Sequence, residues 1–346
     1  MELRSLGASD IRVSALGLGT MTWGEQNDDA DAFAQLDLAL DAGVNFVDTA
    51  EMYPVPPQAE TQGRTETILG RWLSVPGRRA RVVLATKVAG PGPSFAWIRE
   101  GRTRYNLPTL QGALEGSLRR LRTDHVDLYQ LHWPERNTNF FGAREYRPVD
   151  DDDATPPDEV LRALQDLHHA GKARLFGLSN ETPWGLMAFL RAAELAGLPR
   201  IVSVQNPYSL LNRTFEIGMA EIAHRERVGL LAYSPLGMGV LTGKYAGGAR
   251  PANARMTMFS RFQRYMGPEA LRASDRYVAL ARAHGVDPAQ LALAWILTRP
   301  FVTSALVGAT TLAQLQVNLA AASTPIDEAL QRQVDEIHAA WPNPAP

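Results

Sequence analysis

The sequence predicts an α/β fold, a (β/α)₈ or TIM barrel that spans residues 1–346 as a single domain. Three observations lead to this prediction. Eight short apolar segments of the kind that form buried parallel strands occur along the chain. Segments with helical periodicity separate them, as the crossover connections of a parallel sheet require. With 346 residues and 45% hydrophobic content, the chain is long enough to build one such barrel.

The predicted strands are short and each ends on a polar or small residue. They cover residues 15–19, 44–48, 82–86, 126–132, 173–179, 201–205, 228–234 and 304–308, after an N-terminal hairpin. Helices are predicted over residues 30–43, 65–73, 110–124, 159–172, 184–197, 215–227 and 288–300, and two more, 311–322 and 326–340, close the chain. Gly43, Gly171 and Gly197 follow apolar helical stretches, where we expect left-handed C-terminal caps.

Charge and composition exclude several classes of protein. The net charge is -2, from 35 basic and 37 acidic residues, and no long basic stripe occurs, so nucleic acid and anionic membranes are not expected partners. The chain has no cysteine, which excludes disulfides, thiolate nucleophiles and cysteine metal sites. Because the first residues lack the apolar core of a signal peptide and no apolar span is long enough to cross a bilayer, we expect a cytoplasmic protein. The oligomeric state is left open.

Two connections, residues 133–157 and 235–268, are too long to be simple links. Both follow the C-terminal ends of strands, on the face where barrel loops build functional sites. The first contains an acidic run, residues 150–153, which we interpret as a solvated loop segment because four adjacent carboxylates cannot all face one ion. No metal site is predicted.

The segment GLGTMTWG, residues 17–24, begins like the glycine-rich fingerprint of Rossmann domains. The position of the third glycine holds Thr22, and the segment runs into a polar stretch instead of opening a helix, so a Rossmann domain is disfavoured. We interpret Gly17 and Gly19 as crowded positions at a strand end. The backbone near Thr20 and Met21 is then expected to lie close to a ligand.

Four polar residues lie at or just beyond the C-terminal ends of predicted strands. Asp48 and Tyr53 follow the second strand, Lys87 follows the third, and His132 ends the fourth. In a barrel these strand ends share one rim, so the four side chains are expected to converge. They combine an acid, a cation that activates it, a carboxylate that holds the cation, and a hydrogen-bond donor for an oxygen. This set suits the protonation of a carbonyl group as a hydride arrives.

Each of these residues also has a purely structural interpretation. Tyr53 alone reads as a half-buried aromatic residue with a satisfied hydroxyl group. Asp48 and Lys87 alone read as a salt bridge at the barrel end, and His132 alone reads as a core histidine. Their joint occurrence at the strand ends favours the catalytic interpretation.

Seven motifs, in this order and spacing, resemble those of the aldo-keto reductases. Residues 50–67, AEMYPVPPQAETQGRTET, and the region from SLLNR to FSRF, residues 209–262, resemble the bacterial Tas-type branch of that family. The motifs are VDTAEMY, ATKV, LHWP, GLSNE, VQNPYSLLNR, LLAYSPLGMGVLTGKY and LVGATTLAQLQVNL. The resemblance runs nearly end to end. It implies a (β/α)₈ barrel, NADPH bound without a Rossmann domain, and the reversible reduction of a small aldehyde or ketone. By the same resemblance, Tyr53 is the proton donor, Lys87 its activating cation, Asp48 the partner of that lysine, and His132 the residue that orients the carbonyl.

The resemblance also implies where the nicotinamide half of the cofactor binds. Ser179, Asn180 and Gln205 offer hydroxyl and amide groups at adjacent strand ends, suited to holding a carboxamide in one orientation. Tyr233 matches the aromatic platform for the nicotinamide ring. The loop that follows brings backbone amides and a lysine near the pyrophosphate; its candidate residues are Ser234, Pro235, Leu236, Gly239, Leu241, Gly243 and Lys244.

At the adenosine end, Arg255 matches the family's phosphate-binding arginine, and an arginine prefers a 2′-phosphate to a hydroxyl, which favours NADPH. Further candidates follow the last strand, namely Gly308, Thr310, Gln314 and Asn318. Gln314 stands where many relatives have arginine. An alternative interpretation of Arg255 is a surface charge in a loop.

The substrate pocket is expected to be walled by Trp23 and Trp133, which leave strand ends beside the four catalytic candidates. Both residues are also compatible with a role as lids packed on the rim. Two functions stay open. One is an NADPH-dependent carbonyl reductase; the other is a regulatory or interaction protein that binds NADP(H) on the same barrel with low turnover. A Schiff-base enzyme using Lys87 is disfavoured, because Asp48 would keep that amine protonated.

Overall fold

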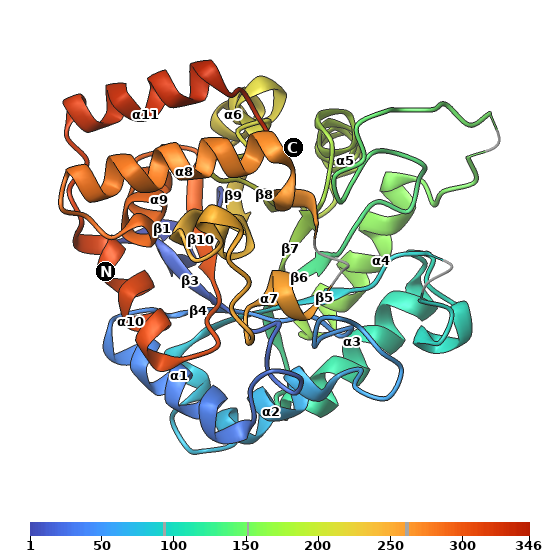
Figure 1. Ribbon diagram of the computed structural model, residues 1–346. Helices are drawn as coiled ribbons and strands as arrows, with labels where there is room; N and C mark the ends of the chain where they lie inside the picture. The colour runs from blue at the N-terminus through green and yellow to red at the C-terminus, as the bar shows by residue number, and fades with distance from the viewer. Residues whose placement is uncertain (93–94, 151, 260–262) are drawn as a thin grey trace.

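The computed structural model describes residues 1–92, 95–150, 152–259 and 263–346. Asp151 of the acidic run and residues 260–262 of the second long connection therefore lie outside the described residues. Eight parallel strands form a closed barrel in the order β10-β3-β4-β5-β6-β7-β8-β9 (Figure 1). The barrel strands are β3 (Leu16–Gly19), β4 (Phe46–Asp48), β5 (Val83–Val88), β6 (Val126–Leu131), β7 (Ala173–Ser179), β8 (Ile201–Pro207), β9 (Gly229–Tyr233) and β10 (Val302–Val307). The predicted (β/α)₈ barrel is confirmed.

Helices surround the barrel, and several begin at an Asn, Asp or Thr whose side chain accepts a hydrogen bond from the first turn. The helices are α1 (Asp29–Asp41), α2 (Arg64–Leu73), α3 (Leu107–Leu121), α4 (Pro157–His169), α5 (Pro183–Ala196), α6 (Phe215–Glu226), α7 (Arg255–Met258), α8 (Pro268–Ala283), α9 (Pro288–Leu297), α10 (Leu312–Ala320) and α11 (Glu328–Ala340). Gly43, Gly171 and Gly197 have positive φ angles, and Gly197 is the left-handed cap of α5, as predicted.

The N-terminal hairpin closes the bottom of the barrel. Its strands β1 (Leu3–Ser5) and β2 (Arg12–Ser14) pair in antiparallel fashion. Leu6 and Val13 pack against side chains from inside the barrel, including Phe46 and Leu128. Gly7 lies so close to the barrel that a β-carbon there would be 2.1 Å from the carbonyl oxygen of Val202, and its φ is +59°. With this end plugged, the C-terminal ends of the strands are the open end.

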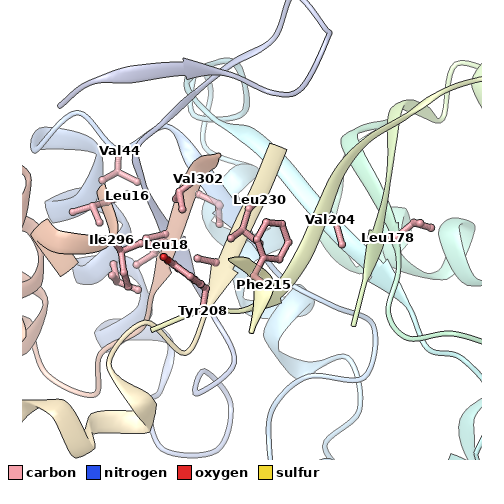
Figure 2. Packing of buried hydrophobic residues seen from close by; sticks show 14 of the residues in the cluster. Leu16, Leu18, Val44, Leu178, Val204, Tyr208, Phe215, Leu230, Ile296 and Val302 are labelled. Carbon is pink, nitrogen blue, oxygen red and sulfur yellow. The ribbon is translucent and has the colours of Figure 1, made fainter. Parts of the chain in front are cut away.

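The main hydrophobic core lies between the outer face of the barrel and the helices. Figure 2 shows part of it, with Leu178, Val204 and Leu230 on neighbouring strands, and Phe215 of α6 belongs to the same cluster. Full burial of side chains of this size stabilises the fold by roughly 1.5–3 kcal/mol each. The strands therefore carry apolar residues on both faces, which is why each one reads as a continuous apolar run in the sequence.

Two parts of the fold differ from the predicted alternation. Helix α8 was not predicted, so that two long helices, α8 and α9, separate β9 from β10. The second long connection is not one open loop but contains the 3₁₀ turns η4 (Gly237–Thr242), η5 (Ala246–Gly248) and η6 (Arg264–Met266) and the short helix α7. The other 3₁₀ turns in the described ranges are η1 (Arg79–Arg81), η3 (Ile98–Gly101) and η7 (Ala321–Ser323).

The interpretation of Gly17 and Gly19 as crowded positions is confirmed for Gly17 and wrong for Gly19, where a β-carbon would lie no closer than 3.6 Å to its neighbours. A β-carbon at Gly17 would lie 2.8–2.9 Å from side chains of Leu306, Phe46 and Ser304. None of the helices in the described part of the chain has the length and apolar character needed to cross a bilayer. Across the same residues, no three His, Asp or Glu side chains are grouped so that they could hold a metal ion.

Candidate active site

The ammonium group of Lys87 is the centre of the polar cluster at the open end of the barrel. Lys87 lies on β5 and is fully buried. Its Nζ donates to Oδ2 of Asp48 at 2.6 Å, to the carbonyl oxygen of Thr49 at 2.9 Å and to the hydroxyl oxygen of Tyr53 at 3.3 Å. An ammonium group donates three hydrogen bonds and accepts none, so the Tyr53 oxygen is the acceptor. The Tyr53 hydroxyl proton is thereby left to donate elsewhere.

The pKa values in this cluster follow from burial and from one dominant pair of charges. Burial lowers the pKa of Lys87, but Asp48 and Tyr53 together more than offset this, so that the pKa is raised and the amine stays protonated. Burial raises the pKa of Tyr53 above 10, the charge of Lys87 opposes that rise, and the charge of Asp48 adds to it. Tyr53 is thus a neutral acid whose anion has one cation in direct contact.

His132 completes the four candidates on the same rim. Its ring meets that of Tyr53 edge-on, with the centroids 5.9 Å apart. Burial, together with the charge of Lys87, holds the pKa of His132 well below 6.5, so the ring is neutral. Nδ1 is buried without a hydrogen-bond partner. Because a buried N–H without an acceptor is rarer than an unused acceptor, the proton belongs on Nε2, which makes Nε2 a hydrogen-bond donor.

A pair of glutamines holds the other oxygen of Asp48. Oδ1 accepts from Nε2 of Gln130 at 3.0 Å and from Nε2 of Gln205 at 2.9 Å, and all three side chains are buried. Asp48 is therefore fixed by three donors from β5, β6 and β8. Gln130 was not among the residues predicted from the sequence. The available signal was an amide side chain within the strand VDLYQL, in which Asp127 is a second buried polar residue.

The residues expected to hold the nicotinamide carboxamide lie beside this cluster. Asn180 has a φ of +54° and donates from Nδ2 to the carbonyl oxygen of His132 at 2.9 Å and to the hydroxyl of Ser179 at 3.1 Å. The hydroxyl of Tyr233 donates to Oδ1 of Asn180 at 2.7 Å. Ser179, Asn180, Gln205 and Tyr233 are thus brought together at the strand ends. In this arrangement the amide of Gln205 is engaged with Asp48.

The loop after β9 turns sharply at a run of residues with positive φ. Ser234, Gly237, Met238, Gly239 and Gly243 all adopt this conformation. The other candidates from this loop, Pro235, Leu236 and Leu241, pack within the turn, where the amide of Leu241 donates to the carbonyl of Leu236. Such a turn exposes backbone amides on its concave side.

Two cations border this loop. Gly239 has a φ of +93°, which favours glycine, and a β-carbon there would lie 2.7 Å from Nζ at the flexible end of Lys244. Burial and the charge of Arg255 lower the pKa of Lys244, and burial lowers the pKa of Arg255. Arg255 begins α7, contacts the sulfur of Met21 at 3.6 Å and is within electrostatic reach of Tyr53. Two partly buried cations that repel each other fit an anionic ligand such as a pyrophosphate.

The candidates after β10 lie around the start of α10. The side-chain oxygen of Gln314 accepts from the amide and the hydroxyl of Thr310, both at 3.1 Å. A β-carbon at Gly308 would be 3.4 Å from the carbonyl oxygen of Gly19. Asn318 is buried on α10. Thr20 is also buried and donates from its hydroxyl to the carbonyl oxygen of Asp48 at 2.9 Å, so the strand end next to Gly308 is tied to the catalytic rim.

The two tryptophans expected in the pocket wall lie in different parts of the molecule. Trp23 is fully buried in the outer core and donates from its indole nitrogen to Gln35 of α1, so its placement as a pocket wall is corrected. Trp133 does lie beside the catalytic rim, 5.0 Å from the ring of His132 and 5.1 Å from that of Phe95. Phe141 of the same connection is 5.9 Å from Trp133. The sequence analysis did not identify these phenylalanines.

The acidic run in the connection after β6 binds other parts of the loops. Asp152 accepts from the backbone amide of Asn137 at 3.0 Å, and Asp153 pairs with Arg104 at 2.8 Å. Both aspartates are exposed. These contacts fit the interpretation of the run as a solvated loop segment.

Comparison with known proteins places this site in a family. The sequence model of the Aldo/keto reductase family matches residues 15–339. The chain is 49% identical over 346 residues, all of both chains, to Protein tas of Escherichia coli (strain K12). It is 34% identical to the uncharacterized oxidoreductase YrpG of Bacillus subtilis (strain 168), over 97% of this chain and 96% of the relative. It is also 34% identical to a probable voltage-gated potassium channel subunit beta of Oryza sativa subsp. japonica, over 93% of this chain and 91% of the relative. The chain therefore belongs to the Aldo/keto reductase family of oxidoreductases, which in general use nicotinamide cofactors.

Proposed function

We propose that this chain is an NADPH-dependent reductase that converts aldehydes or ketones to alcohols, with Tyr53 as the proton donor. The observation that carries the proposal is the buried contact in which Lys87 donates to the hydroxyl oxygen of Tyr53 while it is paired with Asp48. A tyrosine is a weak acid near neutral pH. An adjacent ammonium stabilises the tyrosinate that proton transfer leaves behind.

The residues present fit the cofactor. Lys244 and Arg255 lie close enough to repel each other, and Gly239 leaves space for a close approach of ligand atoms. Bound NADPH would supply a hydride to the carbonyl carbon. Tyr53 would give its proton to the carbonyl oxygen, and Lys87 would stabilise the resulting tyrosinate. Nε2–H of neutral His132 would donate a hydrogen bond to the same oxygen and fix its position.

The preference for NADPH over NADH rests on Arg255. A guanidinium group forms charge-assisted hydrogen bonds with a phosphate that it cannot form with a ribose hydroxyl. Gly308, Thr310, Gln314 and Asn318 are the proposed contacts for the adenosine end. Trp133, with Phe95 and Phe141 around it, is the proposed apolar wall for the substrate.

The substitution Tyr53→Phe tests the reaction. It removes the proton but keeps the ring, so kcat for an aldehyde such as 4-nitrobenzaldehyde should fall at least ~100-fold, while the Kd for NADPH changes by less than about threefold. The loss of NADPH absorbance measures kcat, and a fluorescence titration measures the Kd for NADPH. Near-normal turnover would remove Tyr53 from the mechanism.

The similarity to a channel beta subunit supports a second candidate function, that of a regulatory protein that binds NADP(H) and reduces substrates only slowly. His132 favours the enzyme, because it places a neutral donor beside Tyr53. Oxidation of NADPH in the presence of reactive aldehydes decides between the two. Tight binding of NADPH without turnover of any aldehyde would favour the regulatory function.

A further inference from the structure

Arg264 is a cation with no carboxylate partner at the junction of the two long connections. It begins η6 and is half-buried. None of the described aspartates and glutamates pairs with it; its electrostatic neighbours are the hydroxyl groups of Tyr233 and Tyr265, and its guanidinium lies 5.9 Å from the centroid of the Tyr265 ring. A partly desolvated guanidinium without a counter-charge is costly unless a ligand supplies one.

Tyr265 gives an independent indication of a missing ligand. Its side chain is fully buried, and the neighbour of its hydroxyl group is the guanidinium of Arg264, which can only donate, so the hydroxyl proton has no acceptor. A buried hydroxyl left unpaired costs about 1–3 kcal/mol relative to a paired one, so such groups are uncommon unless a bound molecule pairs with them. The hydroxyl of Tyr233 is already used, because it donates to Asn180. Arg264 already interacts with the hydroxyl oxygens of both tyrosines. The donors left at this point are therefore its remaining N–H groups and the hydroxyl proton of Tyr265, a set suited to an anion.

The position of this pair connects it with the catalytic rim. A β-carbon at Gly142 would lie 2.7 Å from Nε of Arg264, so the connection that leaves His132 touches the guanidinium. Gly142 has a φ of +90° and follows Phe141, whose ring packs on Trp133. On the other side, Tyr233 reaches the backbone of His132 through Asn180.

This location favours the substrate side of the rim. The cations proposed for the cofactor phosphates, Lys244 and Arg255, lie close to each other, and Arg255 contacts Met21 after β3. Arg264 instead contacts the connection after β6, which carries the aromatic residues beside His132. An anion bound at Arg264 would thus share a wall with the proposed substrate pocket.

We propose that Arg264 and Tyr265 form an anion-recognition site for the substrate, and that the protein selects carbonyl compounds that carry a carboxylate or a similar anionic group. Arg264 supplies charge-assisted hydrogen bonds to that group, and Tyr265 donates one more from its hydroxyl. The inference rests on the proposed reductase function, since it names the substrate class of the same site. The anion could also come from a cofactor phosphate, and the test separates these two sources.

The test compares two aldehydes of nearly equal shape, 4-carboxybenzaldehyde and its methyl ester, with NADPH as the reductant. For the unmodified protein, kcat/KM should be about 10- to 100-fold higher for the carboxylate, and the preference should shrink as salt is added. In Arg264→Met most of this preference should disappear through a higher KM for the carboxylate, while the ester changes by less than about threefold. Arg264→Lys should keep part of the preference, and Tyr265→Phe should lower it with no change in net charge.

Two controls make the result specific. Arg144→Met removes one positive charge from an exposed position of the neighbouring connection and should leave the preference unchanged. The Kd for NADPH, measured by fluorescence titration without any aldehyde, should stay within about twofold in Arg264→Met and Tyr265→Phe. If Arg264→Met does not fold, kcat/KM for the acid and the ester is compared in Tyr265→Phe and Arg264→Lys instead.

Three outcomes would overturn the inference. Equal activity on the acid and the ester in the unmodified protein would show that the site does not recognise a substrate anion. A parallel loss of NADPH affinity in Arg264→Met would assign the site to a cofactor phosphate. Equal losses on both aldehydes in Arg264→Met would assign Arg264 to loop structure. In all three cases the ester is still reduced, whereas failure of the proposed reductase function would leave both aldehydes unreduced.

Discussion

In the proposed mechanism, Lys87 is the residue on which the acidity of Tyr53 depends. Its charge opposes the rise in the pKa of Tyr53 that burial causes, so Lys87→Met should raise that pKa further and lower kcat at least ~100-fold. Tyr53 must be protonated to act, so reduction slows as pH rises through its pKa, and this basic limb should move to higher pH in Lys87→Met. The measurement is kcat against pH with one aldehyde.

Asp48 provides the control for that prediction. Asp48→Asn weakens the hold on the ammonium without removing its charge, so kcat should fall less than in Lys87→Met. Because the two side chains are in direct contact, the double variant should resemble Lys87→Met alone. Wild-type kcat and pH dependence in Lys87→Met would reduce the pair to a structural salt bridge.

Gln130 is expected to act as a positioning residue through Asp48. Gln130→Met keeps the length of the side chain but removes one of the two donors to Oδ1 of Asp48. Loss of a hydrogen bond to a charged group is worth about 1.5–3 kcal/mol, so kcat should fall roughly 10-fold or more with a shifted basic limb.

Gln205→Met is the matched variant. Because Gln205 is also a proposed nicotinamide contact, the Gln205→Met protein should lose NADPH affinity, whereas the Gln130→Met protein should not. A Gln130→Met protein that is only less stable, with an unchanged pH profile, would contradict the positioning role.

At the level of single residues, the candidate catalytic side chains could be predicted from the sequence, but not all of the contacts between them. Lys87, Asp48 and Tyr53 follow predictable strand ends, so their convergence could be expected. The contacts of Gln130 and Gln205 with Asp48 could not, because the sequence does not say which oxygen of a carboxylate meets which amide across the barrel. Trp23 was misplaced for a similar reason: a strand end does not determine whether the next aromatic side chain turns toward the rim or toward the helices.

Among the elements, α2 is linked to β5, the strand that carries Lys87, by the buried carboxylate of Glu66. Glu66 of α2 is fully buried, accepts from the hydroxyl of Thr86 at 2.6 Å and pairs with Arg120 of α3 at 2.7 Å. Thr86 directly precedes Lys87 on β5. Glu66 therefore links two helices to the strand that carries the catalytic cation.

Glu66→Ala should lower the free energy of unfolding by about 3–5 kcal/mol, because it leaves the buried side of Arg120 without a counter-charge. Urea denaturation measures this loss. Glu221→Ala on α6 breaks an exposed pair with Arg225 and should cost less than about 1 kcal/mol. Equal costs for the two variants would mean that burial of Glu66 adds nothing to the stability of the α2–β5 contact.

The strands were easier to predict than the connections. A buried strand has apolar residues on both faces, so a short apolar run identifies it. Helix α8 was not predicted although its buried face is periodic, with Ala270, Ala273, Tyr277, Val278 and Ala281. It is an additional helix between β9 and β10 and so breaks the simple alternation of one helix for each strand. The turns of the 235–268 connection depend on positive φ angles at residues such as Ser234 and Met238, which are not glycine.

For the whole molecule, the barrel could be predicted because eight strands with intervening helices admit few other parallel arrangements. The same topology places every strand end at one rim, which is why residues 39 positions apart, Asp48 and Lys87, could be expected to meet. The anion site at Arg264 and Tyr265 could not be predicted in this way. The proposed site forms between two connections that lack a periodic pattern, and only their packing shows that a guanidinium without a carboxylate partner among the described residues lies beside a buried hydroxyl whose proton has no acceptor.

The stability of the molecule should depend on pH through His132. Burial, together with the charge of Lys87, holds its pKa well below 6.5 in the folded protein. When the pH falls below 6.5, the unfolded chain binds a proton at this position and the folded protein does not, so the free energy of unfolding decreases. The contribution of one such group reaches about 1.4 kcal/mol per pH unit, until the pH approaches the folded-state pKa.

This dependence can be isolated with variants that do not titrate. Urea denaturation between pH 7 and pH 5 should show a steeper loss of stability for the unmodified protein than for His132→Gln. His224 is exposed on α6, so His224→Gln should keep the steep loss. If all three proteins lose stability in parallel, then His132 binds its proton as readily in the folded protein as in the unfolded chain. The imidazole would then be charged at pH 5 and nearly neutral only above its ordinary pKa, and its role as a neutral Nε2–H donor across the working pH range would fail.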